Sequence, residues 1–263
     1  TAAEELLLLN VAVYVAAYLF VVFGLRRIEV RRVVEKHETT REILVEGWEF
    51  VKNVPTFKYL TISIFAVNLS LTFIEFSFLA VTHQAFLTNY QTFYGLYRLG
   101  LTVAAFVLQG LVTSRLIEKI TLKNSFLIMP FALVGGSLWM LFAGVASAIG
   151  GMVLPKVAQF TAYDSARRSF QTLVPEERRG RVSTLMESYL FAVGVILASL
   201  AILLVLFLGH WLGELWVSYL YRGLAVICGL WALWAIIKMR QVYDRSMLDW
   251  RLKAFRHWLT MRE

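Results

Sequence analysis

Residues 6–25 have the sequence LLLLNVAVYVAAYLFVVFGL, and residues 26–58 continue with RRIEVRRVVEKHETTREILVEGWEFVKNVPTFK. The first stretch is uncharged and long enough to cross a bilayer, which takes about 20 apolar residues in a helix. The second stretch contains eight Lys and Arg side chains, and basic residues that flank a span stay in the cytoplasm. We therefore expect the chain to cross the membrane from outside to inside at this first span.

The same alternation continues along the whole chain, which is 59% hydrophobic. Six further apolar stretches are candidate spans: Phe57–Val81, Phe93–Ser114, Asn124–Ala146, Ser147–Tyr163, Ser188–Leu208 and Leu215–Ile237. The connections 115–123 and 164–187 and the tail from Lys238 are basic, whereas the other connections contain no Lys or Arg. The sequence thus predicts an all-α membrane protein with seven transmembrane helices, its N-terminus outside and its C-terminus in the cytoplasm.

The charge and the side-chain inventory exclude several classes of function. All but three of the 26 Lys and Arg residues lie in the predicted cytoplasmic segments, so the net charge of +8 indicates membrane orientation and contact with anionic lipid. We therefore expect no nucleic-acid partner. The single cysteine, Cys228, lies in the last span, and the four His residues are scattered. No nucleophile with a base, phosphate loop or metal cluster is found, so we expect no enzyme activity, cofactor or metal.

Four segments follow from this pattern. Residues 1–25 form a single transmembrane helix, 26–58 a cytoplasmic amphipathic linker, 59–238 a six-helix bundle and 239–263 a basic cytoplasmic tail. In the linker we expect one helix at Ile28–Lys36 and a second from a capping box at Thr39 and Glu42 to about Lys52, ended by Pro55. The second helix should lie along the membrane surface. Because the chain opens on Thr1 and has an odd number of spans, we expect it to be the later part of a longer protein.

Three stretches match a known pattern of loop motifs: VEGWEFVKNVPTFKYLTI (45–62), GLVTSRLIEKI (110–120) and LVPEERRGRVSTL (173–185). With one span, a linker and six spans, they resemble the second part of a major facilitator superfamily transporter. The first resembles the start of the family's seventh helix, and the third its Pro-x-Glu-x-Arg-Gly-Arg segment. The second resembles the Gly-x-x-x-Asp-Arg-x-Gly-Arg-Arg loop, with Ser114 in place of the Asp.

This resemblance implies a twelve-helix fold of two bundles, of which the chain would supply the sixth helix and the whole second bundle. It also implies alternating access, in which the two bundles rock about a central site. FTAYDSARRSFQTLVP, residues 160–175, in addition resembles the ATP/ADP exchange carriers, a related branch in which an aromatic-Asp pair precedes a basic residue.

Ionisable side chains inside a bilayer cost several kcal/mol unless they meet partners or water. The candidates for substrate binding or coupling are Glu75, Arg98, Lys156 and Arg222, with Asn68 as a polar neighbour. In a structural interpretation, Glu75 pairs with Arg98, Arg222 snorkels or bonds backbone carbonyls, and Lys156 meets a carboxylate from the missing helices. In a functional interpretation, the two excess positive charges line a central cavity and attract an anionic or zwitterionic solute, with Lys156 deepest. Only Glu75 could then support proton coupling.

Charged groups at the predicted cytoplasmic helix ends are candidates for a gate: Arg115, Lys119, Asp164 and Arg167. The family resemblance implies that the first two clamp neighbouring helices in the outward-open state, and Asp164 with Arg167 could form the matching lock. The following charge run, Glu176–Arg179, is favoured as a solvated surface.

The sequence therefore predicts a multi-pass transporter of a small solute in a bacterial inner or cell membrane, with the bilayer and the missing N-terminal helices as partners. The alternative is a non-transporting membrane subunit or sensor with a transporter-like fold inside a larger membrane complex. It is motivated by the incomplete set of spans, the degenerate loop at 110–120 and the basic tail Tyr243–Glu263.

Overall fold

The computed structural model describes residues 2–24, 40–111, 120–142, 144–174 and 176–260. It divides into two units, Thr1–Thr39 and Thr40–Glu263. All regular structure in the described residues is helical, which confirms the predicted class. In the first unit these residues form one helix, α1 (Ala2–Gly24). The predicted helix at Ile28–Lys36, the Thr39 cap and the gate residues Arg115 and Lys119 lie outside the described residues.

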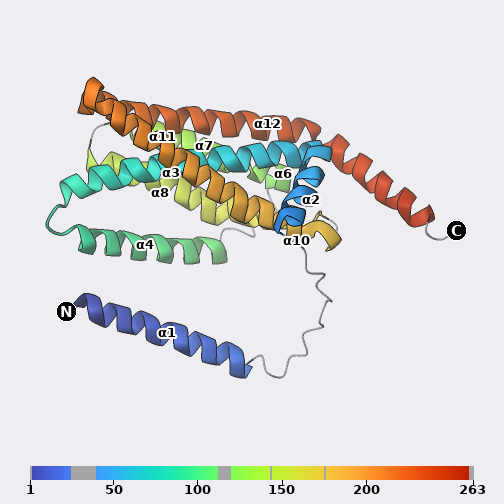
Figure 1. The fold of residues 1–263 in the computed structure, drawn as a ribbon, viewed down its shortest axis with the longest axis horizontal. Coiled ribbons are helices and arrows are strands. Elements are labelled where there is room, and N and C mark those ends of the chain that lie inside the picture. Colours follow the sequence, from blue (N-terminus) through green and yellow to red (C-terminus); the bar gives the residue numbers. More distant parts are fainter. Residues whose placement is uncertain (1, 25–39, 112–119, 143, 175, 261–263) are drawn as a thin grey trace. The chain divides into compact units, whose positions relative to one another are not determined.

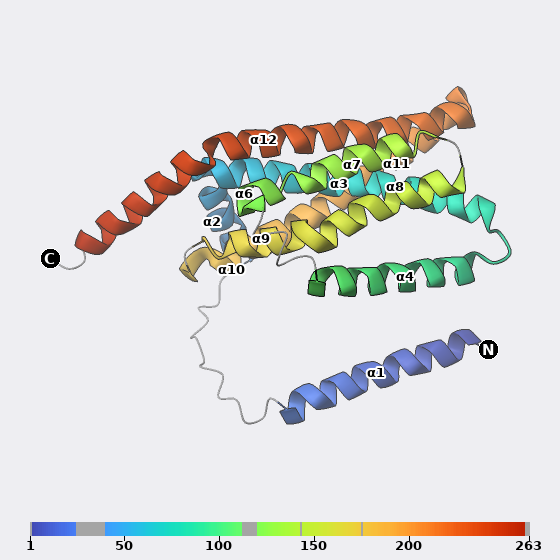
Figure 2. The ribbon, with the colours of Figure 1, turned by 180° about the vertical axis from the view of Figure 1, so that it is seen from behind.

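The second unit is a bundle whose helices run back and forth between two ends (Figures 1 and 2). Its elements are α2 (Thr40–Asn53), α3 (Pro55–Ala85), α4 (Tyr90–Leu111), α6 (Leu122–Ser125), α7 (Ile128–Trp139), α8 (Val145–Ala158), η1 (Gln159–Tyr163), α9 (Asp164–Gln171), α10 (Glu176–Thr184), η2 (Leu185–Tyr189), α11 (Leu190–Leu212) and α12 (Glu214–Thr260). Helices α2, α6, α9 and α10 gather at one end, which we call the linker end. The α3–α4 and α11–α12 connections lie at the opposite end, which we call the turn end.

Three helical segments of the described residues are long and apolar enough to cross a membrane: Pro55–Ala85, Arg178–Gly209 and Trp216–Arg245. The other predicted spans are helical but less regular. Helix α7 has only 12 residues and is separated from α6 by a turn, and α4 has polar residues in its first half, Arg98 among them. Helix length and apolar composition thus establish three candidate spans, and the other four predicted spans stay predictions.

Helix α3 is the central element of the bundle. Pro55 stands at its first turn, where a missing backbone N–H costs no hydrogen bond. Four of its buried residues have small hydroxyl side chains and recur every seven residues along the helix: Thr56, Ser63, Ser70 and Ser77. Small residues at such spacing let neighbouring helices approach closely in a membrane.

Helix α12 packs antiparallel against α3. Three edge-on aromatic pairs join them: Tyr59–Trp234, Phe65–Trp231 and Phe76–Tyr221, with ring centroids 6.2, 6.0 and 5.2 Å apart. Between them the Ser70 hydroxyl donates a hydrogen bond to the Ala225 carbonyl at 2.9 Å. Later residues of α3 thus meet earlier residues of α12, and the contact extends along most of α3.

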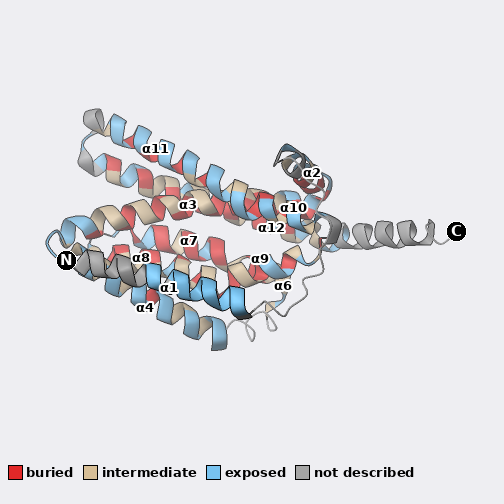
Figure 3. Ribbon diagram, turned by 60° about the horizontal axis from the view of Figure 1, so that its bottom comes forward, coloured by how far each residue is buried: buried red, intermediate tan, exposed pale blue. Residues whose placement is uncertain are grey.

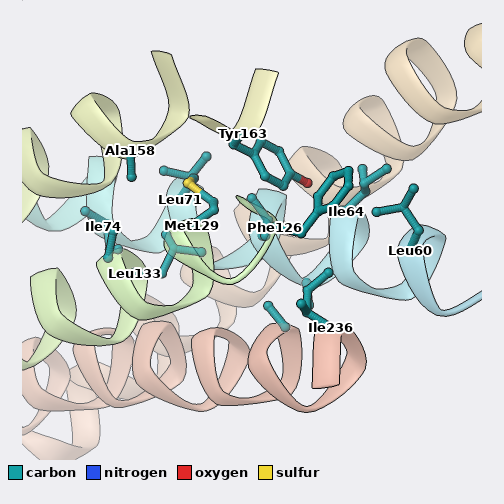
Figure 4. Close-up of a cluster of buried hydrophobic side chains, with 14 of the residues drawn as sticks. Leu60, Ile64, Leu71, Ile74, Phe126, Met129, Leu133, Ala158, Tyr163 and Ile236 are labelled. Atoms are coloured by element: carbon teal, nitrogen blue, oxygen red, sulfur yellow. The ribbon is translucent and has the colours of Figure 1, made fainter. Parts of the chain in front are cut away.

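The core lies between α3, α7, α8, η1 and α12 (Figure 4). Fully buried side chains there include Leu60, Ile64, Ile74, Met129, Leu133 and Ile236. Phe126, between α6 and α7, packs edge-on against Phe170 of α9 with centroids 5.6 Å apart. Since lipid is as apolar as these residues, close van der Waals packing contributes more to this core than transfer from water does.

Large apolar side chains remain exposed on α4 and α11 (Figure 3). On α4 the only buried residue is Leu101, and Phe106 is 81% exposed. On α11 Phe207 is 73% exposed. In an integral membrane protein such faces meet lipid or further helices.

At the linker end, α2 packs against α10, as Figure 1 shows. Arg181 forms an ion pair with Glu46, and the Cα of Gly47 is so close to α10 that an added Cβ would lie 3.2 Å from the Arg181 carbonyl oxygen. Phe50 is buried against Phe57 at 5.1 Å. Helix α2 confirms the predicted second linker helix, and these contacts fix it to the bundle.

Helices α7 and α8 cross at a contact that only glycine permits. A Cβ on Gly151 would collide with the Met140 side chain and lie 2.6 Å from the Gly136 carbonyl oxygen. Gly151→Ala should therefore lower the free energy of unfolding by about 1–3 kcal/mol, the usual cost of overpacking. The measurement is loss of helical circular dichroism on heating in detergent.

Gly100→Ala is the matched control, since a Cβ at Gly100 meets nothing within 4 Å. It should leave the unfolding temperature unchanged or raise it, because Ala is the better helix former by about 1 kcal/mol. Equal destabilisation by both changes would contradict the close-approach explanation.

Candidate functional site

The described residues enclose a cavity of about 830 Å³. Its walls are α3, the continuous segment α8–η1–α9, and η2 with α11. Each wall contributes one helical face: Asn68, Thr72, Glu75 and Leu79 from α3; Lys156, Gln159 and Tyr163 from α8 and η1; Phe191, Val195, Ser199 and Leu206 from α11. Because these positions recur every three or four residues, each helix presents one stripe to the same space.

Five acidic or basic side chains line this cavity: the carboxylates Glu75, Asp164 and Glu187, and the cations Lys156 and Arg167. Arg167 is central among them, since its Nη2 lies 3.8 Å from Asp164 Oδ1 and 3.9 Å from Glu187 Oε1. Gln171 donates a hydrogen bond from Nε2 to Glu187 Oε1 at 2.9 Å. The lining is therefore of mixed charge, with one more carboxylate than cation.

Two π-helical turns shape the cavity. Gln159 and Tyr163 lie in η1, and Glu187 lies in η2. A π-helical turn shifts the residues after it around the helix axis, and such turns often occur at functional sites. Lys156 before η1, Gln159 and Tyr163 within it, and Asp164 and Arg167 after it all line the cavity.

Four buried polar atoms of this lining have no hydrogen-bond partner among the described residues: Gln159 Oε1, Tyr163 Oη, Asp164 Oδ1 and Arg167 Nε. A buried polar atom without a partner costs about 1–3 kcal/mol. Their clustering on one wall marks a place where a bound molecule or another part of the protein could supply donors and acceptors.

The protonation of Asp164 is set mainly by burial, which raises its pKa above the ordinary carboxyl value. Arg167, Arg168 and Lys156 act in the opposite direction and lower the pKa, while Glu187 raises it. Burial outweighs the cations, so this carboxyl holds its proton to a higher pH than a solvent-exposed one does.

Five of the predicted site residues meet in this cavity: Asn68, Glu75, Lys156, Asp164 and Arg167. The sequence placed the first three at a central site and the last two at a separate cytoplasmic gate. Asp164 and Arg167 instead line the same space as Lys156, because η1 and α9 continue α8 without interruption.

The other two membrane candidates lie elsewhere. Arg98 is exposed on α4, and the ion pairs of the described residues do not include one between it and Glu75. Arg222 lines a second cavity between α3, α11 and α12, where its Nε donates a hydrogen bond to Ser77 Oγ at 3.3 Å. The excess positive charge predicted for one central site is thus distributed over three places.

Sequence reasoning missed several residues. Gln159 and Tyr163 follow Lys156 at helical spacing, and Glu187 precedes Phe191 of the same lining by four residues, within the π-helical turn η2. In the charge run predicted to be solvated, Arg179 donates hydrogen bonds to the Thr172 and Val174 carbonyls, both at 3.3 Å. In the described parts of the chain, no three His, Cys, Asp or Glu side chains are grouped as metal ligands.

Comparison with known families and proteins gives one match. The model of the Major Facilitator Superfamily matches residues 5–199. No curated protein and no solved structure matches the chain.

The raised pKa of Asp164 has a consequence for stability. Since the folded protein binds this proton more tightly than the unfolded chain, the contribution to stability is full below the unfolded pKa and is lost as pH rises through the folded pKa. Asp164→Asn removes it. The unfolding temperature of the variant relative to wild type should therefore rise as pH increases from about 4 to about 8. If the difference in unfolding temperature between the two proteins stays constant over this pH range, the pKa of Asp164 is not raised.

Proposed function

Since the chain belongs to the Major Facilitator Superfamily, a family of membrane transporters, we propose that its mixed-charge cavity binds a small solute and that alternating access carries the solute across. The single observation behind this proposal is the convergence of Glu75 from α3 and of Lys156 and Asp164 from the distant α8–η1–α9 segment on one cavity. Solute sites of transporters commonly lie near the bilayer midplane between repeats. A volume of about 830 Å³ is ample for a small molecule.

The charge of the lining favours a zwitterion over a simple anion. Of the cations expected at the centre, only Lys156 lines the cavity, and it is accompanied by Arg167 and three carboxylates. A solute with one positive and one negative group could pair with both kinds of side chain, whereas an anion would face three carboxylates. We therefore assign Lys156 to the negative group of the solute and Glu75 to the positive group, with Asn68 as a hydrogen-bonding neighbour.

The buried polar atoms support a ligand on the same wall. Gln159 Oε1 is an acceptor, Tyr163 Oη can donate or accept, and Arg167 Nε is a donor, so together they suit a polar solute. Since an unpaired buried group is costly, binding that satisfies these atoms gains specificity as well as affinity.

The membrane arrangement proposed from the sequence also fits the bundle. We propose seven spans, with the turn end outside and the linker end in the cytoplasm, and with the chain forming the sixth helix and second bundle of a twelve-helix protein. The exposed apolar faces of α4 and α11 would then meet lipid and the first bundle. The Arg167–Asp164–Glu187 group lies toward the linker end and would close the cytoplasmic side, together with Arg115 and Lys119. The alternative, a non-transporting subunit, gains no support from the described residues or the family match.

Solute binding is testable with the purified protein in detergent. Amino acids, dicarboxylates and alkylamines serve as zwitterionic, anionic and cationic probes, and a ligand at 100 times its Kd stabilises the folded state by about 2.7 kcal/mol. We expect zwitterions to raise the unfolding temperature. Lys156→Gln should weaken this binding about 10- to 100-fold, since a charged hydrogen bond is lost.

Lys58→Gln is the matched control, because Lys58 is exposed at the start of α3. It should bind the same probe with unchanged affinity. Stabilisation by dicarboxylates alone would overturn the zwitterion assignment, and identical binding by Lys156→Gln and wild type would remove Lys156 from the site.

The proposed orientation predicts opposite accessibility for two exposed positions. Two variants are made in a Cys228→Ser background. Thr88→Cys places a cysteine in the α3–α4 connection, and Ser169→Cys places one in α9. A membrane-impermeant maleimide added to intact cells should label the first variant, and should label the second only after permeabilisation. Labelling of both from the same side would refute the assignment of the two ends to opposite faces of the membrane.

A further inference from the structure

The second cavity, about 450 Å³, lies near the turn end between α3, α11 and α12. Phe76 and Leu206 line both this cavity and the large one, so the two are neighbours. The polar lining of the second cavity consists of Gln84 from α3 and Ser218, Tyr221 and Arg222 from α12. The proposed solute site does not use any of these four residues.

Arg222 is the one charged residue among the described residues that line this cavity. Its guanidinium has five N–H donors, of which Nε–H is donated to Ser77 Oγ at 3.3 Å. The ion pairs of the described residues do not include Arg222. Its terminal nitrogens have no hydrogen-bond or ion-pair partner among the described residues, and their planar arrangement matches two oxygens of a phosphate or carboxylate.

In the proposed membrane arrangement, the depth of Arg222 corresponds to the membrane interface. Helix α3 has 31 residues, so at ~1.5 Å per residue it is about 46 Å long and exceeds the ~30 Å hydrocarbon core at both ends. Gln84 lies one residue before the end of α3. Arg222 lies eight residues after the start of α12, about 12 Å along it. In that arrangement the cavity extends from the level of the lipid headgroups into the adjoining part of the hydrocarbon core.

The remaining surfaces favour a lipid over a soluble anion. Leu206, Val217 and Phe76 give the cavity apolar walls. Beside it, Phe207 on α11 and Trp216 on α12 are 73% and 67% exposed. A free anion gains nothing from these walls, whereas a phospholipid can place its phosphate at Arg222 and its acyl chains along the exposed apolar faces.

We propose that this cavity binds the phosphate of an anionic phospholipid. Arg222 pairs with the phosphate, and Gln84 and Ser218 donate hydrogen bonds to the headgroup. In the proposed orientation the lipid belongs to the outer leaflet. The site is independent of solute transport, so it stands even if the solute proposal fails.

The test measures lipid retention by native mass spectrometry of the purified protein titrated with phosphatidylglycerol, phosphatidylcholine or inorganic phosphate. Wild type should retain phosphatidylglycerol in preference to phosphatidylcholine, whose choline cation is repelled by Arg222. Arg222→Gln should reduce phosphatidylglycerol affinity about tenfold or more, the effect of losing one charged hydrogen bond. Arg222→Lys should retain binding more weakly than wild type, since it keeps the charge and loses the paired donors.

Arg98→Gln is the matched control, because Arg98 is exposed on α4 and lies outside both cavities. Its lipid binding should equal that of wild type. Equal losses of lipid affinity for Arg98→Gln and Arg222→Gln would overturn the site. So would unchanged lipid binding by a folded Arg222→Gln. Where Arg222→Gln does not fold, unchanged binding by Arg222→Lys would overturn the site. Binding of inorganic phosphate with the same dependence on Arg222 would overturn the lipid as its ligand.

Discussion

The antiparallel contact of α3 with α12 is the constraint on which the rest of the bundle depends. Lipid does not drive apolar helices together, so their association requires close packing and a few interhelical hydrogen bonds. The buried hydroxyls of α3 supply both, because Ser70 is small enough for close approach and donates to the Ala225 carbonyl at 2.9 Å. The aromatic pairs from Tyr59–Trp234 to Phe76–Tyr221 extend this contact along the helix and fix its register. Helix α7 then packs on the same side, with Val134 against Gly229.

The position of the cavity follows from this packing. At ~100° per residue in an α-helix, Asn68 and Glu75 lie on a different face of α3 from Ser70 and Ser77. Because the hydroxyl face packs against α12, the face with Asn68 and Glu75 is turned toward α11 and η1, where the cavity lies. The close α7–α8 crossing at Gly136 and Gly151 holds the opposite wall, and Lys156 is five residues beyond that crossing. The residues that set the helix packing therefore also set the position of the charged site.

The class of fold and much of the site were accessible from sequence, because both depend on local pattern. Apolar length and basic flanks predicted helices, Pro55 predicted the end of α2, and the rarity of charge within spans singled out Glu75 and Lys156, which both line the cavity. Positions that depend on helix rotation were not accessible. Nothing local shows that Arg222 is turned to a different cavity from Lys156, or that η2 brings Glu187 to the site. Asp164 was predicted to belong to a gate because hydropathy marks a span end there; since the helix continues through this point, Asp164 also lines the same cavity as Lys156.

Rotation also explains why two positive charges within the predicted spans have different environments. Lys156 shares its cavity with Glu75, Asp164 and Glu187, so its charge is balanced within the bundle. Arg222 lines a cavity whose described lining has no carboxylate, and in our proposal a lipid phosphate balances its charge. A count of charges along the sequence treats the two as equivalent and assigns both to one substrate. The geometry separates them, and the chemistry expected at each follows: a polar solute with two opposite charges at Lys156, and a phosphate at Arg222.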